Sequence, residues 1–289
     1  MNIAEFLLPG MPELPEVETI SRQLSKLIGG KKIKEVEVRL AKMVKTPLAQ
    51  FKRALKGAKI RKVGRRAKLL VFELDNGWSF LAHLKMTGQM VYQSTASNKQ
   101  LMAESKHTHL VFHFSDKTRL LFNDLRQFGY IKLADTNKLG EFFIKEGLGP
   151  EPLEKDFALA DFEALLAKKP KAKIKQFLMD PKTIAGIGNI YSDEILFFAG
   201  VHPLRRNQSL KKGEIKKIYQ GIKKILPEAI RSKGTSANNY LDAFGRKGGF
   251  LAKLKVYGRE GENCVKCKGR VARIKIGGRS AHFCPACQK

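Results

Sequence analysis

The sequence predicts an α+β fold, in which a β-rich N-terminal half with a leading helix precedes a helical C-terminal half. Three stretches of hydrophobic patterning predict it. Apolar residues recur at helical spacing over residues 12–28, alternate at strand spacing over residues 33–133, and return to helical spacing from residue 159 onward. Because the strands come first and most helices follow, the two kinds of element are expected to segregate and not to alternate.

The N-terminal pattern predicts particular elements. The leading helix is predicted to end at Gly29-Gly30, because successive glycines are poor helix formers. Residues 69–74 and 78–84 are apolar runs that flank Asp75-Asn76-Gly77, a strong turn signal, and are predicted to form a hairpin. With the alternating residues 109–114, this hairpin indicates an antiparallel β domain, either a sandwich or a barrel.

Glycine and proline gather over residues 135–155, which predicts a linker between two domains. Helices are predicted at residues 159–167, 174–179, 190–199 and 211–230, with short strands and turns from residue 256 onward. The predicted organisation is an N-terminal domain over 12–134, a linker over 135–155, a helical domain over 156–255 and a cysteine-containing end over 256–289.

The charge balance indicates a polyanionic partner. The 289 residues include 55 Lys and Arg against 27 Asp and Glu, a net charge of +28 that exceeds what solubility needs. The basic residues are spread along the chain, which favours a basic face on a folded body and nucleic acid as its ligand. Charge alone leaves open an anionic membrane or a ribosome-associated structural role. No apolar stretch approaches the ~20 residues of a membrane helix, and residues 1–10 do not resemble a secretion signal, so we expect a cytoplasmic protein.

All four cysteines lie near the end of the chain, at Cys264, Cys267, Cys284 and Cys287. Their C-x2-C-x16-C-x2-C spacing is typical of a tetrahedral zinc site. Two disulfides or four free thiols are the alternatives, and a cytoplasmic location disfavours the disulfides. Four thiolates leave no ligand position for water, so we predict one structural Zn²⁺ that holds together a segment too small for a core of its own.

A series of short motifs occurs in a fixed order along the chain. They are Pro12-Glu13-Leu14-Pro15-Glu16-Val17-Glu18, Arg65-Arg66-Ala67-Lys68, His83-Leu84-Lys85-Met86-Thr87-Gly88, Lys106-His107-Thr108-His109, Asn123-Asp124-Leu125-Arg126-Gln127-Phe128-Gly129, Leu148-Gly149-Pro150-Glu151-Pro152, Leu178-Met179-Asp180, Gly186-Ile187-Gly188-Asn189-Ile190-Tyr191 and Val256-Tyr257-Gly258-Arg259. With the four cysteines, this order resembles the formamidopyrimidine-DNA glycosylase family from Met11 to Lys289. The resemblance implies an N-terminal β-sandwich with a leading helix, and a C-terminal helix–two-turn–helix domain with a zinc-finger β-hairpin.

The first motif implies the chemistry. In the family an N-terminal proline, here Pro12, attacks C1′ of a damaged nucleotide, and the adjacent Glu13 is the proton donor or shuttle. A terminal amine with a pKa near ~8 is partly unprotonated at neutral pH. In this sequence Pro12 follows Met11, so its nitrogen is a tertiary amide. We therefore expect residues 1–11 to be absent from the mature protein, with Met1–Gly10 a misassigned start; a processed leader or an inactive paralogue are the alternatives.

The resemblance assigns further roles around the lesion. Lys68 and Arg279 match family residues that support the elimination steps and contact DNA phosphate. Met86, Arg126 and Phe128 match three residues that fill the gap left when the damaged nucleotide is extruded from the stack. Arg126 is expected to hydrogen-bond the orphaned cytosine. By spacing alone, Met86 and Phe128 fit a hydrophobic core and Arg279 fits a solvated surface.

The remaining predicted contacts bind the DNA backbone or the lesion. Two glycines precede Asn189 and allow close approach of a phosphate to a helix N-terminus, where Asn189 adds a side-chain donor. Lys171, Lys175 and His107 are further predicted phosphate contacts. Residues 235–250 match a mobile loop that covers the extruded base and is expected to hold 8-oxoguanine mainly through backbone groups.

The resemblance implies a monomeric DNA glycosylase and abasic-site lyase that acts on double-stranded DNA containing oxidised bases or abasic sites. One alternative is a catalytically inactive damaged-DNA-binding protein of the same fold, if Pro12 stays internal. Another is an endonuclease VIII-like glycosylase for oxidised pyrimidines, a branch that usually has glycine where Leu14 stands. Leu125 and Gln127 depart from the proline and arginine often found there, which bears on the preference for the opposite base.

Overall fold

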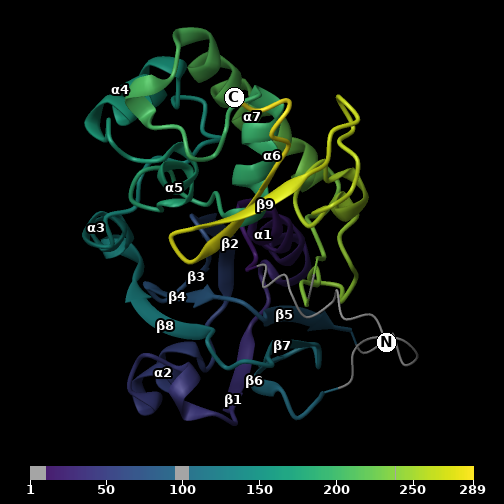
Figure 1. The fold of residues 1–289 in the computed structure, drawn as a ribbon. Helices are drawn as coiled ribbons and strands as arrows, with labels where there is room; N and C mark the ends of the chain where they lie inside the picture. The colour runs from purple at the N-terminus through teal and green to yellow at the C-terminus, as the bar shows by residue number, and fades with distance from the viewer. Residues whose placement is uncertain (1–10, 95–103, 238) are drawn as a thin grey trace. The chain divides into compact units, whose positions relative to one another are not determined.

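The computed structural model describes residues 11–94, 104–237 and 239–289. The predicted extension Met1–Gly10 lies outside the described residues. The chain forms two compact units. Figure 1 shows the ribbon coloured by residue number from the N-terminus to the C-terminus. Unit 1 contains residues up to 146 together with residues 232–249, hereafter the return segment, and unit 2 contains residues 147–231 and 250–289.

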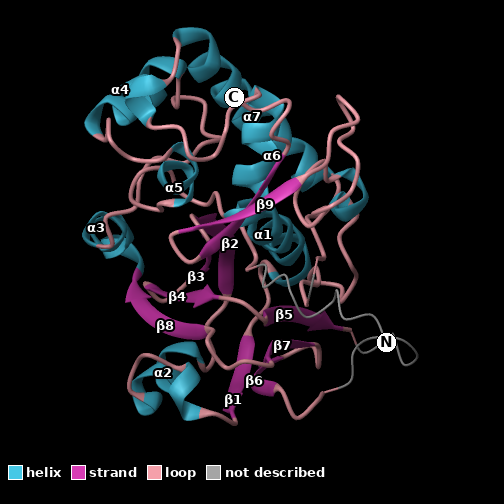
Figure 2. Ribbon diagram, viewed as in Figure 1, coloured by secondary structure: helices cyan, strands magenta, loops and turns pink. Residues whose placement is uncertain are grey.

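Unit 1 is built on two four-stranded antiparallel sheets (Figure 2). The first has the order β1-β6-β7-β5, with β1 Ile33–Val38, β5 Gly88–Gln93, β6 Thr108–Phe114 and β7 Arg119–Asp124. The second has the order β2-β3-β4-β8, with β2 Ile60–Arg66, β3 Leu69–Leu74, β4 Trp78–His83 and β8 Tyr130–Asp135. The predicted hairpin is therefore confirmed as β3 and β4, which pair antiparallel from Leu69 opposite His83.

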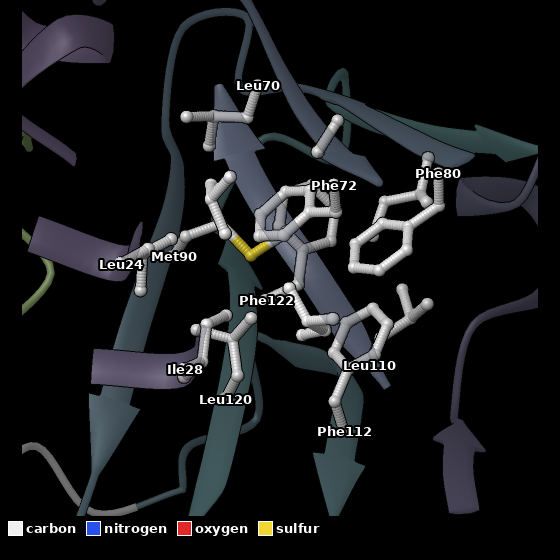
Figure 3. Close-up of a cluster of buried hydrophobic side chains, with 14 of the residues drawn as sticks. Leu24, Ile28, Leu70, Phe72, Phe80, Met90, Leu110, Phe112, Leu120 and Phe122 are labelled. Atoms are coloured by element: carbon white, nitrogen blue, oxygen red, sulfur yellow. The ribbon is translucent and has the colours of Figure 1, made fainter. Parts of the chain in front are cut away.

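The core of unit 1 lies between these two sheets. Its packing shows which of the two predicted architectures, sandwich or barrel, is present. The ring of Phe80 stacks on Phe72 of its own sheet at 4.2 Å and on Phe112 of the other sheet at 5.1 Å, measured between centroids. Two sheets that face each other across interdigitating side chains form a sandwich. Helix α1, Leu14–Ile28, adds Leu24 and Ile28 to the same cluster (Figure 3).

Two helices of unit 1 have no counterpart among the predicted elements. They are α2, Leu48–Leu55, and α3, Leu139–Lys145, with short 3₁₀ turns at Ala41–Met43 and Thr136–Lys138. Helix α3 lies inside the predicted linker 135–155. Its Phe142 and Phe143 pack against Leu69, Val71 and Leu81 on the sheet face opposite the main core. The segment is thus ordered by tertiary packing that a single sequence does not reveal.

Unit 2 has the predicted order of helices followed by a hairpin. Its elements are α4 Leu159–Lys168, α5 Ile174–Met179, α6 Asn189–Ala199, a 3₁₀ turn at Asn207–Ser209, α7 Lys212–Arg231, a 3₁₀ turn at Phe250–Lys253, and strands β9 Ala272–Ile276 and β10 Arg279–Phe283. We call β9, β10 and their connecting turn the zinc hairpin. Within the described ranges, none of the helices has the length and apolar character that a membrane crossing requires.

Candidate functional site

The start of α1 is held by a buried carboxylate. Glu13 occupies the position before the helix, and its backbone N–H donates to Oε2 of Glu16 at 2.9 Å. The other oxygen of Glu16 accepts the backbone N–H of Thr235 at 2.7 Å. Both glutamates are almost fully buried, and Pro12 beside them is buried as well. Glu16 therefore fixes the Pro12-Glu13 pair and joins it to the return segment.

The return segment contacts α1 at a second point. Gln23 donates from its side-chain nitrogen to Asp242 and accepts from the backbone N–H of Ala243, each at 2.9 Å. Asp242 is buried and also accepts the backbone N–H of Arg246 at 2.9 Å. Gly234 has a φ of +81°, and a Cβ there would lie 2.9 Å from an oxygen of Glu16. These contacts explain why residues 232–249 belong to unit 1, whereas the sequence predicts them within a helical domain over 156–255.

Lys68 lies in the turn between β2 and β3. The preceding Ala67 has a φ of 54°, and its carbonyl accepts a hydrogen bond from the Arg65 guanidinium at 2.9 Å. Arg65 also donates to Glu18 of α1 at 2.8 Å. The turn is thus fixed by α1, and Lys68 lies half-buried at its tip.

His83 lies close enough to Lys68 to be affected by its charge, and its motif gives no sign of a separate role. Burial lowers the pKa of its imidazole to about 3, and the positive charges of Lys85 and Lys68 lower it further in the same direction. Nδ1 of His83 accepts the backbone N–H of Lys85 at 3.0 Å, which requires that nitrogen to be unprotonated. A neutral imidazole near Lys68 is a ready hydrogen-bonding group. The feature that distinguishes His83 is the lowered pKa of its imidazole, which the spacing of residues in the sequence does not reveal.

We expect His83 to make the protein sensitive to mild acid. Its folded-state pKa of about 3 lies below the ordinary value of 6.5, so its contribution is intact above pH 6.5 and is lost as pH falls toward 3. Between pH 7 and pH 5 the wild type should lose about 2 kcal/mol of unfolding free energy from this group. Urea unfolding at both pH values should show a smaller loss for His83→Gln. An equal loss in both proteins would refute the assignment.

The gap-filling residues come from two adjacent loops of unit 1. Leu125–Phe128 connects β7 to β8, and the Phe128 side chain is 52% exposed with the Arg126 guanidinium 4.8 Å from its ring centroid. Met86 lies half-buried in the loop between β4 and β5, next to Thr87. An exposed aromatic ring stacked with arginine is suited to contact bases and not to fill a core.

Asp124 holds these two loops together. It is fully buried and accepts the backbone N–H of Gly129 at 2.7 Å and the hydroxyl of Thr87. The Thr87 hydroxyl in turn accepts the backbone N–H of Arg126 at 2.9 Å. His107 lies beside the same aspartate, because its carbonyl accepts the Asp124 backbone N–H at 2.9 Å. Met86, Arg126, Phe128 and His107 therefore lie in segments that Asp124 holds together.

In unit 2, Asn189 is the first residue of α6 and follows the glycine-containing turn. Its Oδ1 is buried and, among the described residues, has no hydrogen-bond partner. Such a group is costly unless a further polar partner binds beside it. Lys171 lies exposed in the turn before α5.

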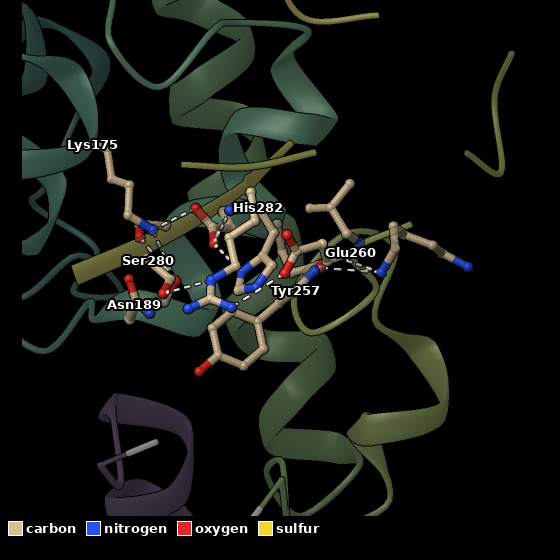
Figure 4. A network of polar contacts seen from close by, with 12 residues as sticks. Lys175, Asn189, Tyr257, Glu260, Ser280 and His282 are labelled. Atoms are coloured by element: carbon tan, nitrogen blue, oxygen red, sulfur yellow. Dashed lines mark hydrogen bonds and ion pairs between the residues drawn. The ribbon is translucent and has the colours of Figure 1, made fainter. Parts of the chain in front are cut away.

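The position of Lys175 differs from the predicted surface contact with phosphate. Its side chain is 1% exposed, and its ammonium pairs with Oδ1 of the buried Asp193 at 2.5 Å. Figure 4 shows Lys175 beside Asn189, whose carbonyl accepts from the same ammonium at 3.4 Å. Because the ammonium is buried and paired, Lys175 is suited to support its neighbours and not to bind DNA directly.

Arg279 follows the two-glycine turn of the zinc hairpin and is exposed. It lines a cavity of about 260 Å³ together with Gln176, Met179 and Asp180. The turn approaches α5 closely, since a Cβ on Gly277 would lie 2.5 Å from Nε2 of Gln176. The hairpin thus presents its arginine at a cavity formed with the first helix of the helix–two-turn–helix.

The four cysteines form one cluster whose geometry fits a metal. All four Sγ atoms lie within 4.8 Å of one another, with Cys264 to Cys287 at 3.8 Å and Cys267 to Cys284 at 3.5 Å. These separations exclude disulfides, whose sulfurs lie ~2.05 Å apart. Tetrahedral thiolates at ~2.3 Å from Zn²⁺ lie about 3.8 Å apart. The residues therefore fit one structural zinc ion, as the spacing predicts.

We expect removal of zinc to abolish order in the hairpin. Phe197, Val256 and Val271 form a small core beside Cys264 and Cys284, so we expect the metal to supply much of the local stability. Stripping zinc with a chelator should lower affinity for damaged duplex at least about tenfold, because the hairpin arginine that is predicted to contact phosphate is no longer presented. Binding titrations with metal content measured in parallel test this expectation, and added zinc should restore binding. Full affinity in zinc-free protein would refute it.

Fold and site place this protein among the DNA repair glycosylases that carry a zinc finger. Sequence models of the formamidopyrimidine-DNA glycosylase N-terminal domain, its H2TH domain, and the zinc finger found in FPG and IleRS match residues 11–131, 148–240 and 261–289. The chain belongs to the formamidopyrimidine-DNA glycosylase family.

Curated and solved relatives agree with this assignment. A formamidopyrimidine-DNA glycosylase of Listeria innocua is 46% identical over 282 residues, covering 96% of this chain and 100% of the relative. One from Streptococcus pneumoniae is 43% identical, covering 96% of this chain and 99% of the relative. The structure of Lactococcus lactis Fpg in complex with DNA containing an abasic site superposes with a TM-score of 0.88 at 37% identity, covering 96% and 99% of the two chains.

Proposed function

We propose that this protein is a bifunctional DNA glycosylase and abasic-site lyase of base excision repair that acts on oxidised purines, namely 8-oxoguanine and formamidopyrimidines. The observation that carries the proposal is the buried Pro12-Glu13 pair, which Glu16 fixes at the start of α1. Related Lactococcus lactis proteins are described in complex with DNA containing an abasic site and with DNA containing Fapy-dG. These ligands support the same substrate class here.

The chemistry requires Pro12 to carry a free secondary amine. Its nitrogen forms a bond to C1′ of the damaged nucleotide, and the bond from C1′ to the base breaks with the electron pair leaving on the base. Glu13 is placed to donate the proton that lets the sugar ring open, which leaves an iminium at C1′. The iminium acidifies the C2′ proton, so its loss expels the 3′ phosphate, and a second elimination expels the 5′ phosphate.

The other residues bind and orient the DNA in this proposal. Lys68 contacts the phosphate near the lesion, with the neutral His83 beside it. In unit 2, Asn189, Lys171 and Arg279 supply phosphate contacts. Lys175 supports Asn189 by donating a hydrogen bond to the backbone carbonyl of Asn189.

The gap-filling group has a separate role in the proposal. Met86 and Phe128 replace the extruded nucleotide in the stack, and Arg126 hydrogen-bonds the orphaned cytosine. His107 contacts the DNA backbone beside these three residues. The return segment covers the extruded base, because its own contacts join it to the start of α1.

We further propose that the protein is a monomer and acts on chromosomal DNA in the cytoplasm of a bacterium. The named relatives that support this proposal are bacterial proteins. The proposed domains are residues 12–134 with the return segment for catalysis, the rest of residues 156–255 for the helix–two-turn–helix and residues 256–289 for the zinc finger, with residues 135–155 between the first two.

Borohydride trapping tests the function. A duplex with one 8-oxoguanine opposite cytosine is incubated with protein translated from Met11 and, in parallel, with the 289-residue form. We expect a covalent adduct from the Met11 form alone, because only that form can expose the Pro12 amine after methionine removal. Adduct from neither form would overturn the lyase assignment in favour of an inactive damage-binding protein. Trapping on an oxidised pyrimidine in preference to 8-oxoguanine would favour the endonuclease VIII-like alternative.

A further inference from the structure

A buried carboxylate in unit 2 receives bonds from two different structural elements. Asp193 of α6 pairs through Oδ1 with the ammonium of Lys175 in α5 at 2.5 Å. Its Oδ2 accepts the backbone N–H of His282 in β10 at 2.9 Å and lies 3.2 Å from Nδ1 of the same residue. All three side chains are at most 1% exposed. Figure 4 shows this network between α5, α6 and the hairpin strand.

The bonds of Asp193 are directional. A carboxylate only accepts hydrogen bonds, so Nδ1 of His282 must carry the proton it shares with Asp193. The edge of the Tyr257 ring closes the other side of that imidazole, with 5.0 Å between centroids. A buried ion pair adds little stability over a well-packed apolar pair, but it fixes its partners at defined positions. The network therefore sets the position of β10 relative to α6.

Two of the predicted phosphate ligands of unit 2, Arg279 and Asn189, lie at the ends of this network. Arg279 is three residues before His282 on β10, and Gly277 in the preceding turn abuts Gln176 of α5. At the other end, the Lys175 ammonium also donates to the carbonyl of Asn189 at 3.4 Å. Asp193 is thus linked through His282 to the strand that carries Arg279. It is linked through Lys175 to Asn189, the residue that begins α6.

We propose that Asp193 is a positioning residue for DNA binding, which holds Arg279 and Asn189 at the spacing needed to bind phosphates of one DNA backbone together. The inference rests on the proposed function and deepens it, because the side chains of Asp193 and His282 are at most 1% exposed and act through other residues. Without the carboxylate, the zinc hairpin keeps its metal but loses its fixed position against α6. Arg279 then no longer binds its phosphate in register with Asn189.

The test measures the salt dependence of binding. Zinc-loaded protein translated from Met11 is titrated against a duplex with a tetrahydrofuran abasic analogue at several salt concentrations. Loss of one phosphate contact lowers the slope of log K against log salt by about 0.9. A variant that is merely destabilised lowers the active fraction and leaves this slope unchanged. The slope therefore separates a positioning role from a structural one.

We expect Asp193→Asn to weaken binding about tenfold and to lower the slope by about one. Arg279→Ala should have the same two effects. Adding Asp193→Asn to Arg279→Ala should change affinity less than about twofold further, because both substitutions remove the same phosphate contact. Glu214→Gln is the matched control, since it removes the partner of Arg205 elsewhere in unit 2 and should leave the slope unchanged. Additive effects of the two substitutions, or a wild-type slope in Asp193→Asn, would overturn the proposal.

A second variant covers the case in which Asp193→Asn does not fold. Lys175→Met combined with Asp193→Leu leaves neither of the two paired charges buried alone, and it should fold and still show the lower slope. If this double variant has the wild-type slope, the positioning role is wrong. If Arg279→Ala alone leaves the slope unchanged, the inference falls because Arg279 is not a phosphate ligand. Borohydride trapping by the wild type would still stand in that case, so the proposed lyase activity is judged separately.

Discussion

Replacing Glu13 by glutamine is expected to slow excision of 8-oxoguanine about 1000-fold in protein translated from Met11. The carboxyl group is the only proton donor next to Pro12 in the sequence, and general acid catalysis typically contributes ~10²–10⁴-fold. Glutamine has nearly the same shape and keeps the backbone N–H that Glu16 accepts at 2.9 Å. The start of α1 should therefore keep its geometry while proton transfer is lost.

Two comparisons make this expectation specific. An abasic site is already present in part as the ring-opened aldehyde, which needs no proton donor for ring opening. Borohydride trapping by Glu13→Gln on a duplex with an abasic site should therefore fall by no more than about tenfold. Glu35→Gln is the control, because Glu35 is an exposed glutamate on β1 of the same unit. It should excise 8-oxoguanine at close to the wild-type rate. Single-turnover excision that is equally fast in Glu13→Gln would remove Glu13 from the mechanism.

Replacing Asp124 by alanine is expected to remove most of the preference for damaged DNA. The buried carboxylate accepts the backbone N–H of Gly129 at 2.7 Å and the hydroxyl of Thr87, so its loss leaves buried donors without a partner. The loops that carry Met86 and Phe128 should then lose their common arrangement. We expect the ratio of affinities for abasic-analogue and undamaged duplex to fall about 30-fold, or about 2 kcal/mol.

The ratio is chosen because a loss of folded protein affects both duplexes equally. Asp116→Ala is the control, since Asp116 accepts the backbone N–H of Thr118 at 3.1 Å in the turn between β6 and β7, within the same sheet as Asp124. It should lower stability without changing the ratio. Phe128→Ala should reproduce most of the Asp124→Ala effect. An unchanged ratio in Asp124→Ala would mean that the two loops keep their positions without it.

Local signals explain why much of the fold could be predicted. The turn signal Asp75-Asn76-Gly77 and the alternating apolar residues beside it specify the β3–β4 hairpin, because register follows from turn type and side-chain alternation. Helix α5 was predicted at its observed bounds, and the other unit 2 helices within one residue. The cysteine spacing likewise specifies the zinc cluster, since each C-x2-C pair brings two thiolates together locally.

The sequence by itself thus determined most of the elements, the metal site and the motifs that indicate the chemistry, but not helices α2 and α3. Only the tertiary structure decided which charged groups are buried and with what partner. It buries Lys175 against Asp193, and it joins Glu16 to Thr235, which is 219 residues away in the chain. It also packs α3 onto the outer face of a sheet. The physical reason is that burial, pairing and pKa depend on contacts between distant segments, which neither periodicity nor local spacing encodes.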